Sequence, residues 1–259
     1  MRANLLHLTA LILIALTAFS CKKTEQFSSD QLSDYIPLQS GKFITYRLDS
    51  TVFPNFGRSM DIHYYEEKNV VDQQITDNLG RTSYRIFRFL RDTLESQPWT
   101  PAGTYFITPT QNTVEVIENN LRFLKLALPI REGFSWKVNR YLPFEPYSDV
   151  YNFGNDDGDE NTGMPTWDDT YGNLNDTLIT SKYRLDHVLT VNGINESSGL
   201  PITDQTNYAY VNYSIDQYAK GIGLVYQEYI MWDYQSNTGN SSGGYKNGFG
   251  VKRTMIDHN

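Results

Sequence analysis

Residues 104–130, TYFITPTQNTVEVIENNLRFLKLALPI, decide the fold class of this chain. They contain three short runs rich in β-branched and aromatic side chains, and short polar segments at 110–112 and 118–120 separate these runs. Such side chains favour a pleated, half-buried surface, and strands joined by tight polar turns pair antiparallel with their neighbours. The stretch therefore predicts an antiparallel meander.

The same chemistry extends in both directions from the meander. Residues 58–76 and 81–92 predict a hairpin, because both runs alternate apolar and polar side chains around a turn that contains Gly80. Residues 182–193, KYRLDHVLTVNG, alternate in the same way, and residues 193–206 predict a loop. Residues 222–234 and the final FGVKRTMIDH predict a long hairpin that closes the domain.

The fold class follows from these strands and from the composition. Aromatic residues make up 14% of the chain, with 19 Tyr among them, and long Ala/Leu/Glu/Lys stretches of helical period are missing. We predict an all-β protein with a single large antiparallel β-domain over residues 35–259, either a sandwich or a half-barrel-like sheet.

The first 20 residues have the three parts of a secretory signal. Arg2 supplies a positive start, and the apolar stretch 5–16 is too short to span a bilayer as a stable helix. Small residues, Ala18 and Ser20, then precede Cys21, which is the single cysteine of the chain. We predict that residues 1–20 are a signal peptide absent from the mature protein.

A signal that ends in a small residue followed by cysteine resembles the bacterial lipobox. The resemblance implies cleavage before Cys21 and attachment of lipid, such as palmitate, to its sulfur and its new amino group. Lipid chains anchor a protein without spanning the membrane, so we expect attachment to the outer membrane. We expect the periplasmic face, because KKTEQ after Cys21 is not the acidic run of surface-exposed lipoproteins. The alternative is an ordinary cleaved signal that leaves a free thiol.

The polar residues 21–34 predict a tether between the lipid and the domain. The chain has a formal charge of −8, which becomes −9 when Arg2 is lost with the signal. A nucleic-acid partner requires a positive surface, so we exclude it. The expected partners are the membrane, through the lipid anchor, and a glycan or another envelope protein; the oligomeric state stays open.

Three blocks carry a resemblance to a known family. DYIPLQSGKFITYRLDST (34–51), YAKGIGLVYQE (218–228) and GFGVKRTMIDHN (248–259) resemble blocks in uncharacterised lipoproteins of Bacteroidota. This resemblance implies a bacterial origin and a location in the cell envelope, and it implies no biochemical activity. The motif YAKGIGLV is also similar to one in periplasmic half-barrel proteins related to lipoprotein carriers.

The motifs of several enzyme classes are absent from the sequence. It has no G-x-S-x-G elbow, no P-loop and no dinucleotide-binding glycine pattern. The three histidines of the mature chain, His63, His187 and His258, are scattered, which leaves a zinc or iron site without ligands. We predict that His187 is a neutral histidine in the core, and that there are no catalytic or cofactor-binding residues.

Aromatic residues on one strand offer a different kind of site. Tyr226, Ile230, Trp232 and Tyr234 share one face of the strand 222–234. Rings on an exposed sheet could stack on sugars or lipids, whereas alternating aromatic residues more often fill the core of a wide sheet. We predict that these side chains belong to the core.

Residues 141–181 predict an acidic loop, with nine acids and no Lys or Arg between Arg140 and Lys182. Its densest run, NDDGDEN, holds Asp156, Asp157, Asp159 and Glu160. Such oxygens could gather a calcium ion, although the spacing does not match an EF-hand. The alternative is a solvated acidic insertion, partly disordered, whose charge serves only solubility. Calcium is therefore the one cofactor that we consider.

We expect a cell-envelope lipoprotein with a non-enzymatic binding or structural role. One alternative is a carboxylate-based hydrolase, with or without calcium, which requires two carboxylates held a fixed distance apart on rigid elements. A deep pocket with an Asp/Glu pair facing it would favour this enzyme. The other alternative is a periplasmic carrier of lipid or lipoprotein, which requires a curved sheet with an apolar concave face.

Overall fold

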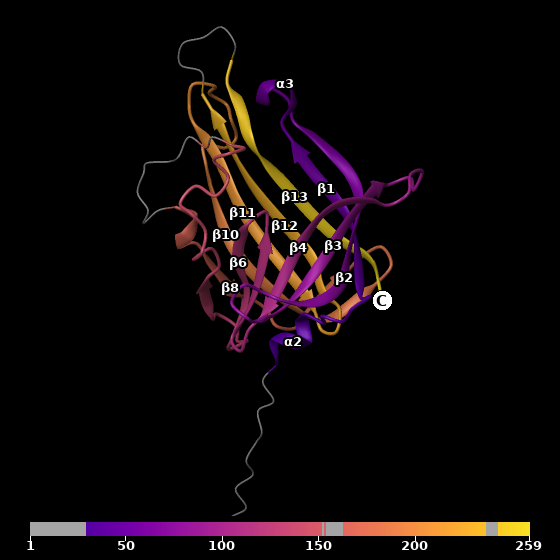
Figure 1. The fold of residues 1–259 in the computed structure, drawn as a ribbon. Helices are drawn as coiled ribbons and strands as arrows, with labels where there is room; N and C mark the ends of the chain where they lie inside the picture. The colour runs from indigo at the N-terminus through magenta and orange to yellow at the C-terminus, as the bar shows by residue number, and fades with distance from the viewer. Residues whose placement is uncertain (1–29, 152, 154–162, 237–242) are drawn as a thin grey trace, which may run out of the picture.

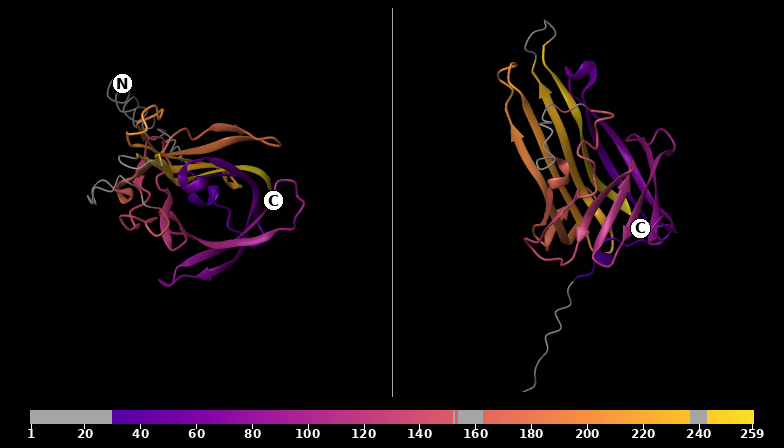
Figure 2. Two further views of the ribbon diagram at one scale, coloured as in Figure 1. Left: turned by 90° about the horizontal axis from the view of Figure 1, so that it is seen from above. Right: turned by 60° about the vertical axis from the view of Figure 1, so that its left-hand side comes forward.

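A computed structural model of the chain describes residues 30–151, 153, 163–236 and 243–259. These residues contain thirteen strands, which form one antiparallel sheet in the order β6-β5-β4-β3-β2-β1-β13-β12-β11-β10-β8-β7, with β9 paired to β10. The sheet curls around an interior and comes close to closing on itself as a barrel (Figures 1 and 2). The prediction of an antiparallel all-β domain is confirmed, in the form of one curved sheet.

The strands carry almost all of the regular structure. They are β1 Phe43–Val52, β2 Asp61–Thr76, β3 Thr82–Asp92, β4 Thr100–Pro109, β5 Thr113–Glu118, β6 Leu121–Ala127, β7 Ser135–Lys137, β8 Asp168–Tyr171, β9 Asp176–Ile179, β10 Arg184–Ser198, β11 Ala209–Ala219, β12 Gly223–Gln235 and β13 Tyr245–His258. The short helices are α2 Leu32–Tyr35, α3 Pro54–Gly57 and η1 Met164–Thr166. Among the described residues, no helix has the length and apolar character needed to cross a membrane.

Neighbouring strands along the chain are mostly neighbours in the sheet. The meander is present as β4, β5 and β6, and the two predicted hairpins are present as β2–β3 and β12–β13. The first strand then pairs with the last, with Ile44 opposite His258 and Thr51 opposite Gly250. This pairing joins the two halves of the chain into one sheet.

The sheet closes through a seam between β6 and the strands β7 and β8. One backbone bond crosses it, from Leu124 N to Val138 O at 2.8 Å. Side chains supply the rest, because Trp136 Nε1 donates to Leu124 O at 2.7 Å and Tyr171 bonds both backbone groups of Ala127. The seam therefore depends on two aromatic residues that also pack against each other, with ring centroids 4.6 Å apart.

The helix α2 lies against one end of the curled sheet, opposite the end that carries α3 (Figure 1). Leu32 and Tyr35 are buried in the core, and Gly221 N donates to Asp34 O at 2.7 Å. Tyr35 also donates to Asp30 Oδ2 at 2.7 Å. The end of the predicted tether, residues 30–34, thus belongs to the domain, because Leu32 and Tyr35 bury apolar surface against it.

The main core fills the α2 end of the sheet. Its buried members are Leu32, Tyr35, Val114, Leu124, Leu126, Ala127, Trp136, Tyr171, Leu189, Val191 and Tyr218. They come from both halves of the chain, so this core ties the meander to β10 and β11 beneath the seam. Cavities remain inside the sheet beyond this core, and they contain the candidate site.

Two predicted loops are more ordered than expected. Within residues 141–181 the described part contains η1, β8 and β9, and β8 pairs with both β7 and β10. Residues 193–206 begin as strand, because β10 continues to Ser198 beside β11. In both places the polar sequence gave no indication of strand pairing. Strands with few apolar side chains are still held in a sheet by backbone hydrogen bonds.

Candidate functional site

The predicted lipidation site, Cys21, and the predicted calcium ligands, Asp156, Asp157, Asp159 and Glu160, lie outside the described residues. Among residues that the structure describes, no group of three or more His, Cys, Asp or Glu side chains could hold a metal ion.

Five other acids of the predicted acidic loop are described: Glu145 and Asp149 are exposed, and the remaining three have separate roles. Asp168 pairs with Lys137 at 2.8 Å on the surface. Asp176 accepts hydrogen bonds from Thr190 Oγ1 at 2.6 Å and Asn173 Nδ2 at 2.6 Å, which fixes β9 on β10. Asp169 alone is buried and faces the interior.

The prediction that His187 is a core residue is wrong. His187 has a φ of 59° at an irregularity in the pairing of β9 with β10, between Leu185 and Val188. The irregularity shifts the alternation, so Val188 and Leu189 are both buried and His187 is exposed, with Nδ1 3.0 Å from Asn175 Oδ1.

The predicted core face of β12 also differs. Gln227 and Tyr229 line the interior, so Tyr226 and Trp232, whose positions alternate with theirs, lie on the other face and are only half-buried. Trp232 packs there against Phe53, with ring centroids 6.2 Å apart. Tyr234 is buried as predicted, while the ring that faces the interior is Tyr229.

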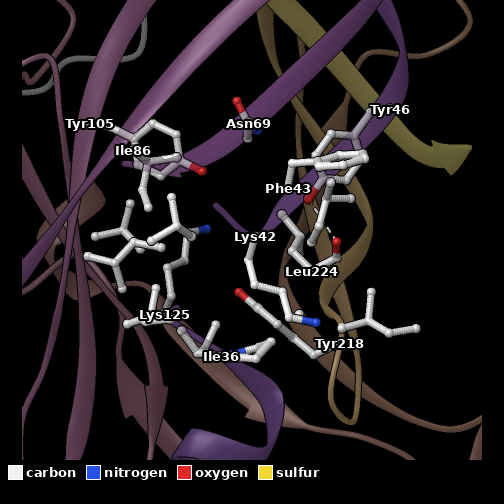
Figure 3. Close-up of a pocket in the computed structure, with 18 of the residues that line it drawn as sticks. Ile36, Lys42, Phe43, Tyr46, Asn69, Ile86, Tyr105, Lys125, Tyr218 and Leu224 are labelled. Atoms are coloured by element: carbon white, nitrogen blue, oxygen red, sulfur yellow. Dashed lines mark hydrogen bonds between the residues drawn. The ribbon is translucent and has the colours of Figure 1, made fainter. Parts of the chain in front are cut away.

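A cavity of about 140 Å³ lies inside the sheet next to α2, and we call it the chamber (Figure 3). Its walls are mainly apolar side chains from the segment after α2 and from several strands. They include Ile36, Leu38, Phe43, Ile86, Ile107 and Leu224. The chamber is thus a mainly apolar pocket built by the inward faces of strands from both halves of the chain.

Two polar groups on the chamber wall have no partner among the described residues. Asn69 Oδ1 is buried and accepts no hydrogen bond, while Asn69 Nδ2 donates to Glu67 Oε1 at 2.9 Å. The Tyr105 hydroxyl forms no hydrogen bond to a described residue, and burial raises its pKa. Both side chains lie on the same side of the chamber (Figure 3). They could orient a ligand that carries a hydrogen-bonding group.

Six charged side chains and the amide of Gln227 cross the interior above the chamber, and we call this set the charge belt. It consists of Glu67, Arg88, Glu118, Lys125, Asp216, Gln227 and Arg253. Glu67 is 1% exposed and accepts two hydrogen bonds from Arg253, at 2.9 and 3.0 Å. Burial opposes its ionisation, but Arg253 and Arg88 outweigh burial and hold the pKa of Glu67 below its ordinary value.

The other half of the belt centres on Asp216. Its Oδ1 accepts from Gln227 Nε2 at 2.8 Å, and its Oδ2 accepts from Lys125 Nζ at 3.0 Å and Tyr218 at 3.4 Å. Burial alone would lower the pKa of Lys125, but Asp216 and Asp169 raise it. The belt therefore keeps Lys125 charged inside the protein.

A second cavity, of about 450 Å³, lies beyond the belt, and we call it the upper compartment. Aromatic rings line one part of it. Phe249 packs with Tyr147, Tyr151 and Tyr229, at centroid separations of 5.3, 5.4 and 5.4 Å. Asp169 lies in its wall, and burial raises the pKa of Asp169 to about 7, with Lys125 partly offsetting this and Asp216 adding to it.

The upper compartment therefore has two aspartates facing it, which is the arrangement that would favour a hydrolase. Both oxygens of Asp216 are already hydrogen-bonded by belt residues, so this carboxylate is a structural acceptor. Glu118 also lines the compartment and pairs with Arg88. Asp169 is left as the carboxyl of this wall that no described residue pairs with. Acid/base hydrolysis of the two-carboxylate type requires both groups to reach the substrate, and the described wall of this compartment offers one such carboxyl.

Sequence analysis missed the belt residues. Such residues can be recognised in a sequence as charged side chains at inward positions of an alternating strand. Glu67 is one such residue, between Tyr65 and Asn69, and Lys125 is another, in the apolar run LRFLKLALPI. Such a residue indicates either an irregular strand or a buried polar network. Only the three-dimensional pairing of strands distant in sequence distinguishes these two cases.

Comparisons with known proteins add little to this picture. No protein-family model matches the chain, and no curated sequence matches it. Among solved structures, the chain is similar to a "putative exported protein with YmcC-like fold" from Bacteroides fragilis. The two share 12% identity and a TM-score of 0.35, over 85% of this chain and 97% of the other. At that score the likeness supports no argument, and the family resemblance of the three sequence blocks stays a prediction.

Proposed function

We propose that this chain is a lipid-anchored protein of the cell envelope whose curled sheet binds a small, mainly apolar molecule in the chamber. The observation that carries this proposal is an apolar cavity with one buried acceptor, Asn69 Oδ1, that no described residue satisfies. An unpaired buried acceptor costs about 1–3 kcal/mol. A ligand that donates a hydrogen bond to it would recover part of that cost and would be oriented by it.

The size of the chamber limits the ligand. A cavity of about 150 Å³ in another protein core holds one benzene molecule, and the chamber, at about 140 Å³, is similar. Two acyl chains of a membrane lipid need far more space. The charge belt also interrupts the concave face of the sheet, so we favour a small ligand over the lipid carrier.

The position of the chamber fits an anchored protein. Cys21 and Asp30 are nine positions apart in the chain, a separation of at most about 30 Å when extended. Asp30 lies beside α2, the helix next to the chamber, through its ion pair with Lys220. A lipid on Cys21 would therefore hold the chamber end toward the membrane, where apolar molecules are concentrated.

Binding can be measured by fluorine NMR with 4-fluorophenol, a small aromatic probe whose hydroxyl can donate a hydrogen bond to Asn69 Oδ1. We expect its resonance to shift or broaden with the wild-type domain. Ile107→Trp, which fills the chamber, should abolish the effect, whereas Ile62→Trp at an exposed position should retain it. The melting temperature of each variant reports folding. An unchanged response from folded Ile107→Trp, or no response from the wild type at millimolar probe, would refute the chamber as a binding site.

The anchor needs a separate experiment. Cys21→Ser should abolish incorporation of radiolabelled palmitate and release the protein from the membrane fraction. Protease treatment of intact cells then tests the face: a protected domain supports the periplasmic side, and ready removal supports the cell surface. Palmitate labelling that persists in Cys21→Ser would contradict the anchor and leave the chamber proposal intact.

A further inference from the structure

The charges inside the sheet do not balance. The cations are Arg88, Arg253 and Lys125, and the carboxylates are Glu67, Glu118, Asp216 and Asp169. Arg253 pairs with Glu67, Arg88 with Glu118, and Lys125 with Asp216. The carboxylate left over is Asp169, and its side chain accepts no hydrogen bond from any described residue. Among the described residues, the interior therefore has one acid without its own cation.

Asp169 is held where solvent does not compensate its charge. It is 5% exposed, and it lies on β8 opposite Trp136 of β7. Gly193 of β10 makes room for it, because a Cβ there would stand 2.8 Å from Asp169 Oδ1 and 2.0 Å from Ser214 Oγ. Asp169 and Ser214 both line the upper compartment, so the carboxyl is directed into that space.

The same compartment provides aromatic faces. Phe249 is surrounded by the rings of Tyr147, Tyr151 and Tyr229. Asp169 is close enough to Tyr229 to contribute to its raised pKa, after burial and Tyr147. Aromatic rings and a carboxylate both attract a cation, the rings through their negative faces.

We propose that the upper compartment is a binding site for an organic monocation, an amine or quaternary ammonium group, held by the Asp169 carboxylate and the rings around Phe249. A single positive charge would balance the interior. At about 450 Å³ the compartment has the volume of a small-molecule site. This site is separate from the chamber, with the charge belt between them, and it does not rest on the function proposed for the chamber.

A proton competes with the ligand for Asp169. The pKa of Asp169 is about 7, so the free carboxyl is mostly protonated at pH 5.5 and ionised at pH 8.5. The other groups facing the compartment or lying beside Asp169 are Glu118, Lys125, Tyr147, Tyr151, Asp168, Asp216, Tyr229 and Arg253. For a ligand that requires the ionised form, affinity should fall about 30-fold between pH 8.5 and pH 5.5.

Calorimetric titration of the wild-type domain with benzyltrimethylammonium at both pH values tests the site, with benzyl alcohol and benzoate as neutral and anionic controls. We expect the cation to bind at pH 8.5, to bind about 30-fold more weakly at pH 5.5, and to bind better than either control. Asp169→Asn should lose most of the affinity and all of the pH dependence. Asp186→Asn, a change of an exposed carboxylate on the neighbouring strand β10, should retain both.

The wild-type titrations need no variant to fold, so they decide the question alone. Equal affinity at the two pH values would overturn the proposal. So would benzyl alcohol binding as tightly as the cation, or an absence of binding by millimolar cation at pH 8.5.

Discussion

Arg253 of β13 donates two parallel hydrogen bonds to Glu67 of β2, from Nε to Oε1 at 2.9 Å and from Nη2 to Oε2 at 3.0 Å. The strand between them, β1, is bridged on its inner side, where Glu67 is 1% exposed. Two-point contact of this kind fixes orientation as well as charge. This ion pair therefore connects β13 to β2 across β1, the strand that lies between them.

Glu67→Gln should destabilise the domain strongly, because it leaves the buried Arg253 without its carboxylate. Breaking one partner of a buried ion pair costs about 3–5 kcal/mol, and urea unfolding measures this. The matched control is Asp49→Asn, which breaks the surface pair of Asp49 with Arg47, whose side chain is 56% exposed. We expect that change to cost less than about 0.5 kcal/mol.

The ion pair of Glu67 with Arg253 also makes the stability of the domain depend on pH in the acid range. The pKa of Glu67 is held below its ordinary 4.5, so its contribution to the free energy of unfolding is present above about pH 4.5 and is lost as pH falls through the lower, folded value. The difference between wild type and Glu67→Gln should be constant from pH 5 to 8 and shrink in stronger acid. A difference that grows on acidification would contradict this account.

Asp169 predicts the opposite pH dependence. Its folded pKa of about 7 lies above the ordinary 3.8, so the stability that it contributes is full below about pH 3.8 and is lost as pH rises through 7. Relative to Asp169→Asn, the wild type should lose roughly 2.5 kcal/mol between pH 5 and pH 8. Thermal unfolding of both proteins, without ligand, measures it. Parallel pH profiles for the two proteins would show that Asp169 titrates normally.

The strands of the meander and of the two hairpins could be predicted because local rules decide them. In TVEVIENNLRF the polar Asn119-Asn120 pair carries the turn, and both residues have positive φ (51° and 63°), which asparagine tolerates better than most residues. The alternation on either side then assigns the strands.

The site could not be predicted in the same way. Glu67, Asp216 and Lys125 lie close together because β1 pairs with β13 and the sheet curls. Neither the pairing nor the curvature can be recognised from the sequence around these residues. At His187 the local rule failed, since one irregular residue in β10 reverses the faces beyond it. Alternation therefore identifies strands, while the direction of a side chain depends on bulges that partner strands impose.

Glycine is required where β12 and β13 approach each other near α3. Gly248 has a φ of +124°, and a Cβ there would stand 2.2 Å from Met231 O, a backbone atom that cannot rotate away. Gly103 has a φ of +149° with open space around it. Alanine at either position carries backbone strain of about 1–3 kcal/mol. Gly248→Ala should cost a further 1–3 kcal/mol or so from overpacking, and equal unfolding midpoints for the two variants would contradict this.

The seam of the barrel depends on the hydroxyl of Tyr171. It accepts from Ala127 N at 3.0 Å and donates to Ala127 O at 2.7 Å, and Tyr171 is 1% exposed. Tyr171→Phe keeps the ring on Trp136 but leaves two buried backbone groups without this partner. We expect a loss of about 1–3 kcal/mol in the free energy of unfolding.

Hydrogen exchange at the Ala127 amide reports the seam directly. In Tyr171→Phe this amide should exchange faster, while amides of the β12–β13 hairpin, far from the seam in the sheet order, keep their protection. The matched control is Tyr226→Phe, because the Tyr226 hydroxyl donates to Glu228 Oε2 at 2.7 Å and the side chain lies on the face away from the interior. If exchange at Ala127 is unchanged in Tyr171→Phe, the backbone bond from Leu124 N to Val138 O and the bond from Trp136 are sufficient to hold the two edges together.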